Sequence, residues 1–445
     1  MFDPIVRGLT AAWTAYKYHP TQVALLGCRK RFVSVPAGRG SGKTDIALRR
    51  LVMALARPKS HGDSPQYFFA GPTVSHAKEV AWNRLLALTP KQWLSGPPLQ
   101  SKDALMIRTR FGSSLQLLGL HGASIRVEGR QWDGGVIDES CDCPLGVFDR
   151  SVLPALTWRN GWCWRIGVPK RFGIGAEEYR DWHEENMTGR HADRAGFWWP
   201  SSDILPAESL AYARAHMDER DYDEQFNAQF VTASGGIFHA FDSEYSVRPC
   251  AYDPGKPILV AQDFNVDPMA WAFGHCYPSP TRPRDRIEWF DELWMRDTNT
   301  QRSLDATVAR YGQHGSGFEF YGDASGKARK TSASSSDLQI IANDERLKKL
   351  GRTMHYLRGN PPVADRFAAT NALICSADGT RRMHVDPRCK RLIHDLQTRP
   401  YKPGTREPGD IGDQGHITDA IGYAIYRLFP IRIPVTGSQS VVVVR

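Results

Sequence analysis

Cysteine is sparse in this chain, and its spacing excludes two kinds of site. Eight cysteines are scattered over 445 residues, and the closest two are Cys141 and Cys143. No two of them have the C-x-x-C spacing typical of zinc ligands, and the pattern of a disulfide framework is absent. Reduced thiols in a cytosolic protein are therefore expected.

Long apolar runs, repeats and low-complexity segments are also missing. No apolar stretch approaches the roughly 18 residues that a membrane helix needs. The start, MFDPIVRGLTAAW, carries an early acid in place of the basic segment that opens a signal peptide. We expect a soluble intracellular protein that does not bind a membrane.

The overall composition is that of a folded globular protein. Hydrophobic residues make up 41% of the chain, and the length suits two or three domains. Lysine and arginine number 57 against 48 acids, which leaves a net charge of +9. This excess favours a polyanionic partner such as nucleic acid, although a basic solvated surface explains it equally well.

A glycine-rich loop stands between a strand pattern and a helix pattern near the N-terminus. RKRFVSV reads as a strand, AGRGSGKT follows at residues 37–44, and TDIALRRLVMALA has apolar residues at helical spacing. Strand, loop and helix in this order are the context of a P-loop. Glycines let backbone N–H groups converge on phosphate oxygens, Lys43 would reach the β- and γ-phosphates, and Thr44 would bind Mg²⁺. The strict pattern begins with glycine where this chain has Ala37, and a chance glycine-rich turn is the alternative.

Two adjacent acids supply the second half of a nucleotide site. WDGGVIDES places Asp138 and Glu139 directly after an apolar pair. The first carboxylate can hold Mg²⁺ through water, and the second can orient the attacking water. Strand-like runs before and after them indicate a parallel α/β sheet, whereas a solvated strand end is the plainer interpretation.

Other residues of the first half are candidates for the nucleotide site, although the sequence patterns that indicate them are weaker. In HPTQ, Gln22 has an amide that can both donate to and accept from an adenine edge. Arg126 and Arg130 precede the acidic pair, and either could supply charge to a γ-phosphate, in its own or a neighbouring subunit. We favour Arg130.

The second half shows carboxylates without a P-loop. PILVAQDFN, MAWAFGHCY, RIEWFDELWM and GFEFYGDASG read as strands, and a helix over 300–312 precedes the fourth. HITDAIGYAIYRL reads as an amphipathic helix over 416–428. This order is that of an RNase H-like domain with a mixed sheet. Asp263, Asp323 and Asp419 would hold two divalent ions, Mg²⁺ or Mn²⁺, with Glu292 as a further candidate ligand. Asp267 and Asp291 are read as supporting or surface acids.

Taken together, these motifs resemble the large terminase subunit of tailed bacteriophages, the motor that packages DNA. AGRGSGKT, including Arg39, is similar to the family's P-loop, HPTQ to its adenine-reading segment and VIDES to its acidic strand. AQDFNVDP, YGDASG and HITDAIGY resemble its nuclease motifs. GVPKR stands where the family has a coupling motif, with Val168 in place of the usual threonine. The residues expected to bind ATP are Gln22, Arg39, Gly40, Ser41, Gly42, Lys43, Thr44 and Asp138.

The resemblance implies a P-loop ATPase domain of RecA/ASCE type over residues 1–240, a linker over 241–256, a nuclease domain over 257–430 and a tail over 431–445. It also implies partners: double-stranded DNA, the portal protein of the procapsid, a small terminase subunit, and further copies in a pentameric ring on the portal, with a monomer in solution as the alternative. The expected location is the cytoplasm of the bacterial host and not the mature virion.

Two other functions stay open at this point. A helicase or translocase with an accessory nuclease domain shares the P-loop and the acidic pair, but it needs a second RecA-like domain. A non-motor P-loop protein with a degenerate nuclease domain is opposed by the intact Lys43, Glu139, Asp263, Asp323 and Asp419.

Overall fold

A computed structural model of the chain describes residues 13, 16–56, 64–101, 104–121, 127–232, 235–265, 267–327, 335–402, 405–409, 412–433 and 442–443. Its internal contacts divide the chain into two compact units, Met1–Leu210 with Asp223–Ala233, and Ala211–Tyr222 with Ser234–Arg445. The expected linker over 241–256 falls inside the second unit in this division, and the boundaries expected at 240 and 257 stay predictions.

The first unit is built on an eight-stranded sheet with the order β3-β4-β5-β2-β6-β7-β1-β8. The strands from β5 to β8 in this order run parallel, and β3 and β4 are antiparallel additions at one edge. The mostly parallel sheet expected from the sequence is thereby confirmed. Its strands are β1 (Phe32–Pro36), β2 (Gln66–Gly71), β3 (Leu99–Gln100), β4 (Leu105–Arg108), β5 (Ser114–Gly119), β6 (Gly134–Ile137), β7 (Trp162–Gly167) and β8 (Arg194–Gly196).

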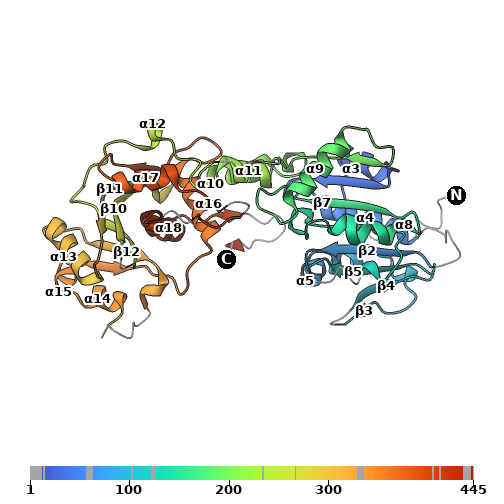
Figure 1. Cartoon of the computed structure of the whole chain (residues 1–445), viewed down its shortest axis with the longest axis horizontal. Coiled ribbons are helices and arrows are strands. Elements are labelled where there is room, and N and C mark those ends of the chain that lie inside the picture. Colours follow the sequence, from blue (N-terminus) through green and yellow to red (C-terminus); the bar gives the residue numbers. More distant parts are fainter. Residues whose placement is uncertain are drawn as a thin grey trace. The chain divides into compact units, whose positions relative to one another are not determined.

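Helices cover this sheet, as parallel strands require (Figure 1). They are α3 (Pro20–Gly27), α4 (Lys43–Leu55), α5 (Val74–Ala77), α6 (Asn83–Leu88), α8 (Leu153–Thr157) and α9 (Ala176–Met187). The residues of two further helices, α10 (Ala207–His216) and α11 (Glu219–Gln225), are divided between the two units. π-Helical turns at Lys78–Trp82 and Phe148–Val152 adjoin α6 and α8. The helix expected after the glycine loop is α4, and its apolar residues Ile46, Leu51 and Leu55 are fully buried in the core.

The second unit is built on a six-stranded mixed sheet with the order β13-β12-β9-β10-β11-β14. β9, β10 and β11 are antiparallel neighbours, whereas β12 runs parallel to β9 and β14 parallel to β11. The expected mixed sheet is thus confirmed. Its strands are β9 (Ile258–Asp263), β10 (Met269–Ser279), β11 (Arg282–Met295), β12 (Phe318–Gly322), β13 (Arg352–Met354) and β14 (Met383–Val385).

The order of three strands, a helix, a fourth strand and a late helix is confirmed by β9, β10, β11, α13, β12 and α18. The helices are α12 (Ser243–Ser246), α13 (Thr300–Tyr311), α14 (Asp337–Asn343), α15 (Glu345–Leu350), α16 (Val363–Ile374), α17 (Lys390–Thr398) and α18 (His416–Leu428), and a two-stranded sheet joins β15 (Arg432–Ile433) to β16 (Val442–Val443). In α18, Ile417, Ile421 and Ile425 are fully buried, as the helical spacing predicts. This face packs α18 against α16 and against β9, β10 and β12.

The eight cysteines are free thiols. Among the described residues, the helices are all too short or too polar to cross a membrane.

Candidate functional site

The glycine loop of the first unit has the backbone that its sequence predicts. Gly40 and Gly42 have φ angles of 71° and 75°, in the left-handed region that favours glycine. A Cβ on Gly38 would lie 2.6 Å from the backbone of Ser201 and of Phe226, so that position has no room for a side chain. α4 then begins at Lys43, which leaves the first N–H groups of the helix available to an anion.

Ala37, where the strict pattern has glycine, fits this loop without strain. It is fully buried and pairs as an isolated bridge with Trp199, and its φ angle is not positive. The departure from the pattern therefore leaves the phosphate-binding part of the loop unchanged.

The acidic pair lies at the same edge of the sheet as the loop. β6 and β1 are both parallel to β7, which lies between them, so their carboxyl ends point the same way. The Thr44 hydroxyl donates a hydrogen bond to Asp138 Oδ2 over 3.2 Å. A hydroxyl and a carboxylate at this separation are hard oxygen ligands that fit Mg²⁺.

The two acids differ in their electrostatic surroundings. Burial and the neighbouring negative charge of Glu139 raise the pKa of Asp138 to about 6. Burial also acts to raise the pKa of Glu139, but the positive charges of Lys43 and Lys170 outweigh it and lower the pKa overall. Glu139 is therefore held in the ionised form, which can accept a hydrogen bond from water.

Lys170 is a member of this site that the sequence motifs did not assign. Its Nζ lies 3.4 Å from Glu139 Oε2 and also contacts the carboxylate of Asp142. The next residue, Arg171, pairs with Glu224 over 3.0 Å. Both residues belong to the segment GVPKR, which follows β7. The position of this segment was the signal in the sequence that could have pointed to Lys170, but the motif gave its lysine no role.

The structure brings Gln22 to the glycine loop. Gln22 is fully buried in α3, and its Nε2 donates to the backbone carbonyl of Ser41 over 3.3 Å and to Tyr16 Oη over 2.9 Å. Arg39 is exposed, and its Nε donates to Gln225 Oε1 over 2.8 Å. An adenine-reading role for Gln22 stays a prediction.

Arg130 lies at the opposite edge of the sheet. It precedes the start of β6 and lines a surface cavity with Gln66, the first residue of β2, and Arg159. Asp138 follows the far end of β6, and a four-residue strand alone spans about 13 Å. Arg130 therefore does not reach the glycine loop of its own chain, and of its two expected roles only action in a neighbouring subunit is compatible with this place. Arg126 lies outside the described residues.

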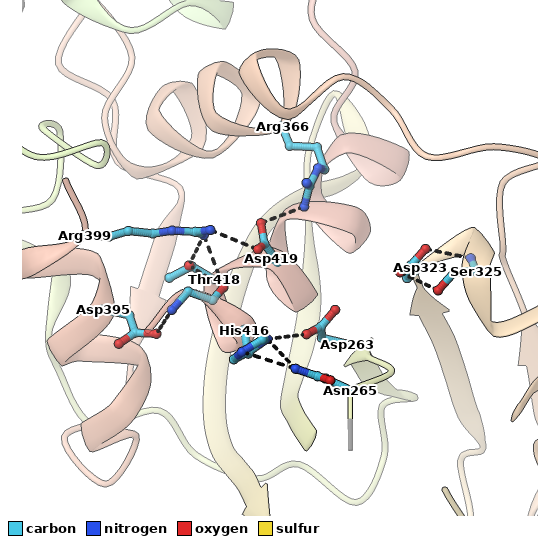
Figure 2. A network of polar contacts seen from close by, with 11 residues as sticks. Asp263, Asn265, Asp323, Ser325, Arg366, Asp395, Arg399, His416, Thr418 and Asp419 are labelled. Atoms are coloured by element: carbon cyan, nitrogen blue, oxygen red, sulfur yellow. Dashed lines mark hydrogen bonds and ion pairs between the residues drawn. The ribbon is translucent and has the colours of Figure 1, made fainter. Parts of the chain in front are cut away.

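In the second unit, the three expected aspartates lie on elements that pack together. Gln262 of β9 pairs with Gly322 of β12, so Asp263 and Asp323 follow at neighbouring positions of one sheet edge. Asp419 lies in the first turn of α18, which packs against both strands. Figure 2 shows the three carboxylates around this edge.

Each aspartate already has donors within the protein. Asp263 Oδ2 contacts His416 Nδ1 over 2.9 Å, while Asp323 accepts hydrogen bonds from Ser325 and Asn360. Burial raises the pKa of Asp263, and the hydrogen bond to that carboxylate raises the pKa of His416. His416 opens the HITDAIGY motif, but nothing in the sequence pairs it with Asp263.

Asp419 lies between two arginines. Arg366 Nη1 is 2.8 Å from its Oδ1, and Arg399 Nη2 is 3.0 Å from its Oδ2. No local pattern singles out either arginine, because they lie 53 and 20 positions away in the sequence.

Glu292 has a different set of contacts. Its carboxylate accepts hydrogen bonds from the backbone N–H groups of Arg391 and Leu392, at the start of α17. No contact within the described residues joins it to the three aspartates, and its role as a ligand stays a prediction. Asp291 accepts from Arg310 and Tyr311, in line with a supporting role.

No group of three or more His, Cys, Asp or Glu side chains in the described ranges is arranged to hold a metal ion. The carboxylates of Asp263 and Asp323 are nonetheless the oxygen ligands that Mg²⁺ and Mn²⁺ prefer. Asp263 Oδ1 has no hydrogen-bond partner among the described residues.

Comparisons with known proteins agree with this arrangement. The fold matches the large terminase of a thermophilic bacteriophage with a TM-score of 0.55 and 14% identity, over 92% of this chain and 99% of that one. Structures of the same terminase in complex with ADP and with ATP-gamma-S match with TM-scores of 0.52 and 0.51, each at 15% identity. They cover 92% and 93% of this chain, and 99% of the terminase in both cases.

Sequence comparison gives two curated relatives, the large terminase subunits of Thermus phage G20c and Thermus virus P23-45. Each is 24% identical over 281 residues, which is 57% of this chain and 56% of the relative. The chain therefore spans about half the length of the curated relatives it matches. No protein-family model matches the chain.

The fold and the sites define a class of two-unit chains, in which a mostly parallel α/β unit with a glycine loop is followed by a mixed-sheet unit that brings three aspartates together. Within that class, the chain is similar in fold and in sequence to the large terminase subunits of bacteriophages. This confirms the resemblance that its motifs indicate.

Proposed function

We propose that this chain is a large terminase subunit that uses ATP to move double-stranded viral DNA into a procapsid, and that it cuts concatemeric DNA into genome units. The observation that carries the proposal is the presence of two chemically distinct sites in one chain. The Thr44–Asp138 pair beside the glycine loop suits a nucleotide with Mg²⁺, and the aspartates of the second sheet suit DNA cleavage.

In the first unit, the geometry supports ATP hydrolysis. Thr44 and Asp138 would hold Mg²⁺, which neutralises charge on the phosphates when bound. Lys43 begins α4 and is buried, so its ammonium group can contact the β- and γ-phosphates. Glu139, ionised beside Lys170, orients the attacking water. An arginine of a neighbouring copy, Arg130, would supply charge to the γ-phosphate.

In the second unit, the geometry supports cleavage of a phosphodiester. Asp263 and Asp323 would hold a divalent ion, Mg²⁺ or Mn²⁺, which lowers the pKa of a water nucleophile when bound. Asp419 of α18 lies beside them, paired with Arg366 of α16 and with Arg399, which follows α17. The net charge of +9 suits the phosphates of a DNA track.

The proposed partners are double-stranded DNA, the portal protein of the procapsid and a small terminase subunit. A ring of copies on the portal, a pentamer, would let Arg130 of one copy meet the nucleotide of the next. The proposed location is the cytoplasm of the bacterial host.

A translocase with an accessory nuclease is the alternative, and the second unit counts against it. Such an enzyme needs a second RecA-like sheet, whereas the second sheet of this chain is mixed and begins with an antiparallel meander.

The test is a packaging assay with the purified chain, procapsids bearing portals, the small subunit and ATP. We expect DNA to become resistant to added nuclease only when all components are present. The Lys43→Ala variant should cut DNA but not package it. If the wild-type chain moves along DNA equally well without a portal, the terminase proposal is wrong and the translocase alternative holds.

A further inference from the structure

The carboxylate of Asp419 is neutralised from both sides by the protein itself. Arg366 binds Oδ1 and Arg399 binds Oδ2, each through a charged hydrogen bond, so each oxygen has its own guanidinium partner. Figure 2 shows the two arginines approaching Asp419 from different directions.

Both guanidinium groups are fixed by more than this carboxylate. Arg366 and Arg399 are only 5% and 6% exposed. Arg399 also donates to the carbonyl of Gly415 over 3.2 Å and to the Thr418 hydroxyl over 2.8 Å. The guanidinium of Arg366 lies 4.3 Å from the centre of the Tyr423 ring. The two arginines are therefore held in fixed positions within the site.

Gly415 provides independent support for that conclusion. Its φ angle is 101°, and a Cβ there would lie between 2.5 and 2.8 Å from atoms of the Arg399 guanidinium. A residue with a side chain at this position would displace the arginine. The backbone just before α18 is thus shaped around Arg399.

The charges at this edge of the sheet then limit how many ions can bind. Asp263, Asp323 and Asp419 contribute three negative charges, and the two arginines contribute two positive ones, which leaves a net charge of −1. One divalent ion brings the group to +1, but two bring it to +3. This count omits any charge on His416 and the charge of Asp395, which interacts with Arg399. Like charges at close range in a partly buried site repel strongly.

We propose that the second unit takes one divalent ion, on Asp263 and Asp323, and that Arg366 and Arg399 occupy the place beside Asp419 that a second ion would otherwise take. This inference rests on the proposed metal-dependent nuclease. Guanidinium groups neutralise a carboxylate as metal ions do, so the pair supplies fixed positive charge beside Asp419 where the two-ion arrangement has a cation. The two arginines act as positioning residues for Asp419.

The experiment counts Mn²⁺ ions on the full-length chain by isothermal titration calorimetry and by electron paramagnetic resonance of free Mn²⁺. An Asp138→Asn background removes the carboxylate ligand of the first unit. We expect one bound Mn²⁺ per chain, lost in Asp263→Asn. In Arg366→Gln or Arg399→Gln, we expect a second Mn²⁺ or at least a tenfold tighter first one.

Three controls separate charge from structure. Arg366→Lys and Arg399→Lys keep the positive charge and should keep the count at one. Arg391→Gln loses the same charge on an exposed arginine of the same unit and should change nothing. The number of Mn²⁺ ions on the chain with both arginines intact needs no substitution at Arg366 or Arg399. It therefore tests the one-ion inference even if a glutamine variant fails to fold.

The outcomes distinguish this inference from the proposed function. Two ions on the wild-type site, with DNA cleavage intact, would overturn the one-ion inference alone. If both glutamine variants are folded and bind Mn²⁺ with unchanged number and affinity, the arginines do not limit how many ions bind. No Mn²⁺ on any form, with no cleavage, would overturn the inference together with the metal-dependent nuclease.

Discussion

Lys170 and Glu139 form an ion pair at the carboxyl edge of the first sheet, with 3.4 Å between Nζ and Oε2. The pair joins the segment after β7 to the acid that we assign to the attacking water. Burial lowers the pKa of Lys170, but the negative charges of Glu139 and Asp142 raise it overall. Each partner therefore stabilises the charged form of the other.

The first prediction concerns this pair. In Lys170→Met the pKa of Glu139 should rise, because one of the positive charges that lower it is gone. In the proposed mechanism ATP hydrolysis needs ionised Glu139, so the acid limb of the pH–kcat profile should move to higher pH. Lys91→Met, at an exposed lysine of the same unit, should leave the profile unchanged. Superimposable wild-type and Lys170→Met profiles would contradict the assignment.

Binding and hydrolysis of ATP should separate at Glu139. Glu139→Gln keeps the shape of the side chain but removes its charge, so turnover should fall about 10²–10⁴-fold. Binding of a fluorescent ATP analogue should stay near the wild-type level, because Lys43 and Thr44 are intact. Lys43→Ala is the contrasting variant and should lose binding. Hydrolysis by Glu139→Gln at the wild-type rate would exclude this role.

Arg130 should act only between copies of the chain. Its place at the amino edge of the sheet keeps it from its own glycine loop. A mixture of Arg130→Ala and Lys43→Ala chains should therefore recover part of the ATPase activity that neither variant has alone, and the recovery should grow with protein concentration. Full activity of Arg130→Ala alone, measured by phosphate release, would remove Arg130 from the mechanism.

The two sites should be separable by mutation. Asp263→Asn removes a carboxylate of the second unit, so plasmid cleavage in Mn²⁺ or Mg²⁺ buffer should be lost while ATP hydrolysis stays within about twofold of wild type. Asp305→Asn, at an exposed acid of the same unit, should keep both activities. Plasmid linearisation by Asp263→Asn would refute the site at the β9–β12 edge.

Gly415→Ala should destabilise the second unit. The residue has a φ angle of 101°, and the added Cβ would meet the Arg399 guanidinium. Strain of this kind costs about 1–3 kcal/mol of the free energy of unfolding. Denaturant unfolding measures the change, with Gly359→Ala as the control because a Cβ there meets nothing within 4 Å. Equal unfolding midpoints for the two variants would contradict the prediction and would show that the Arg399 side chain moves aside at little cost.

Much of this fold can be read from local patterns. The glycine loop, β6 with its two acids, and α18 were all expected at the positions where they occur. The short strands β8, β13 and β14, of three residues each, carry no period of their own and were not expected. Such strands form because longer neighbours offer them open hydrogen-bonding edges.

The sequence by itself determined the parts whose chemistry is local. Glycines at positions 40 and 42 permit positive φ angles, and an acid after a buried strand is placed at a sheet edge, whatever the rest of the chain does. The tertiary structure alone decided which distant charges meet. Arg366 and Arg399 reach Asp419 from two other segments, and Arg130 is kept from its own loop by the length of β6. Ion pairs between remote segments depend on how strands and helices pack, and no short pattern encodes that packing.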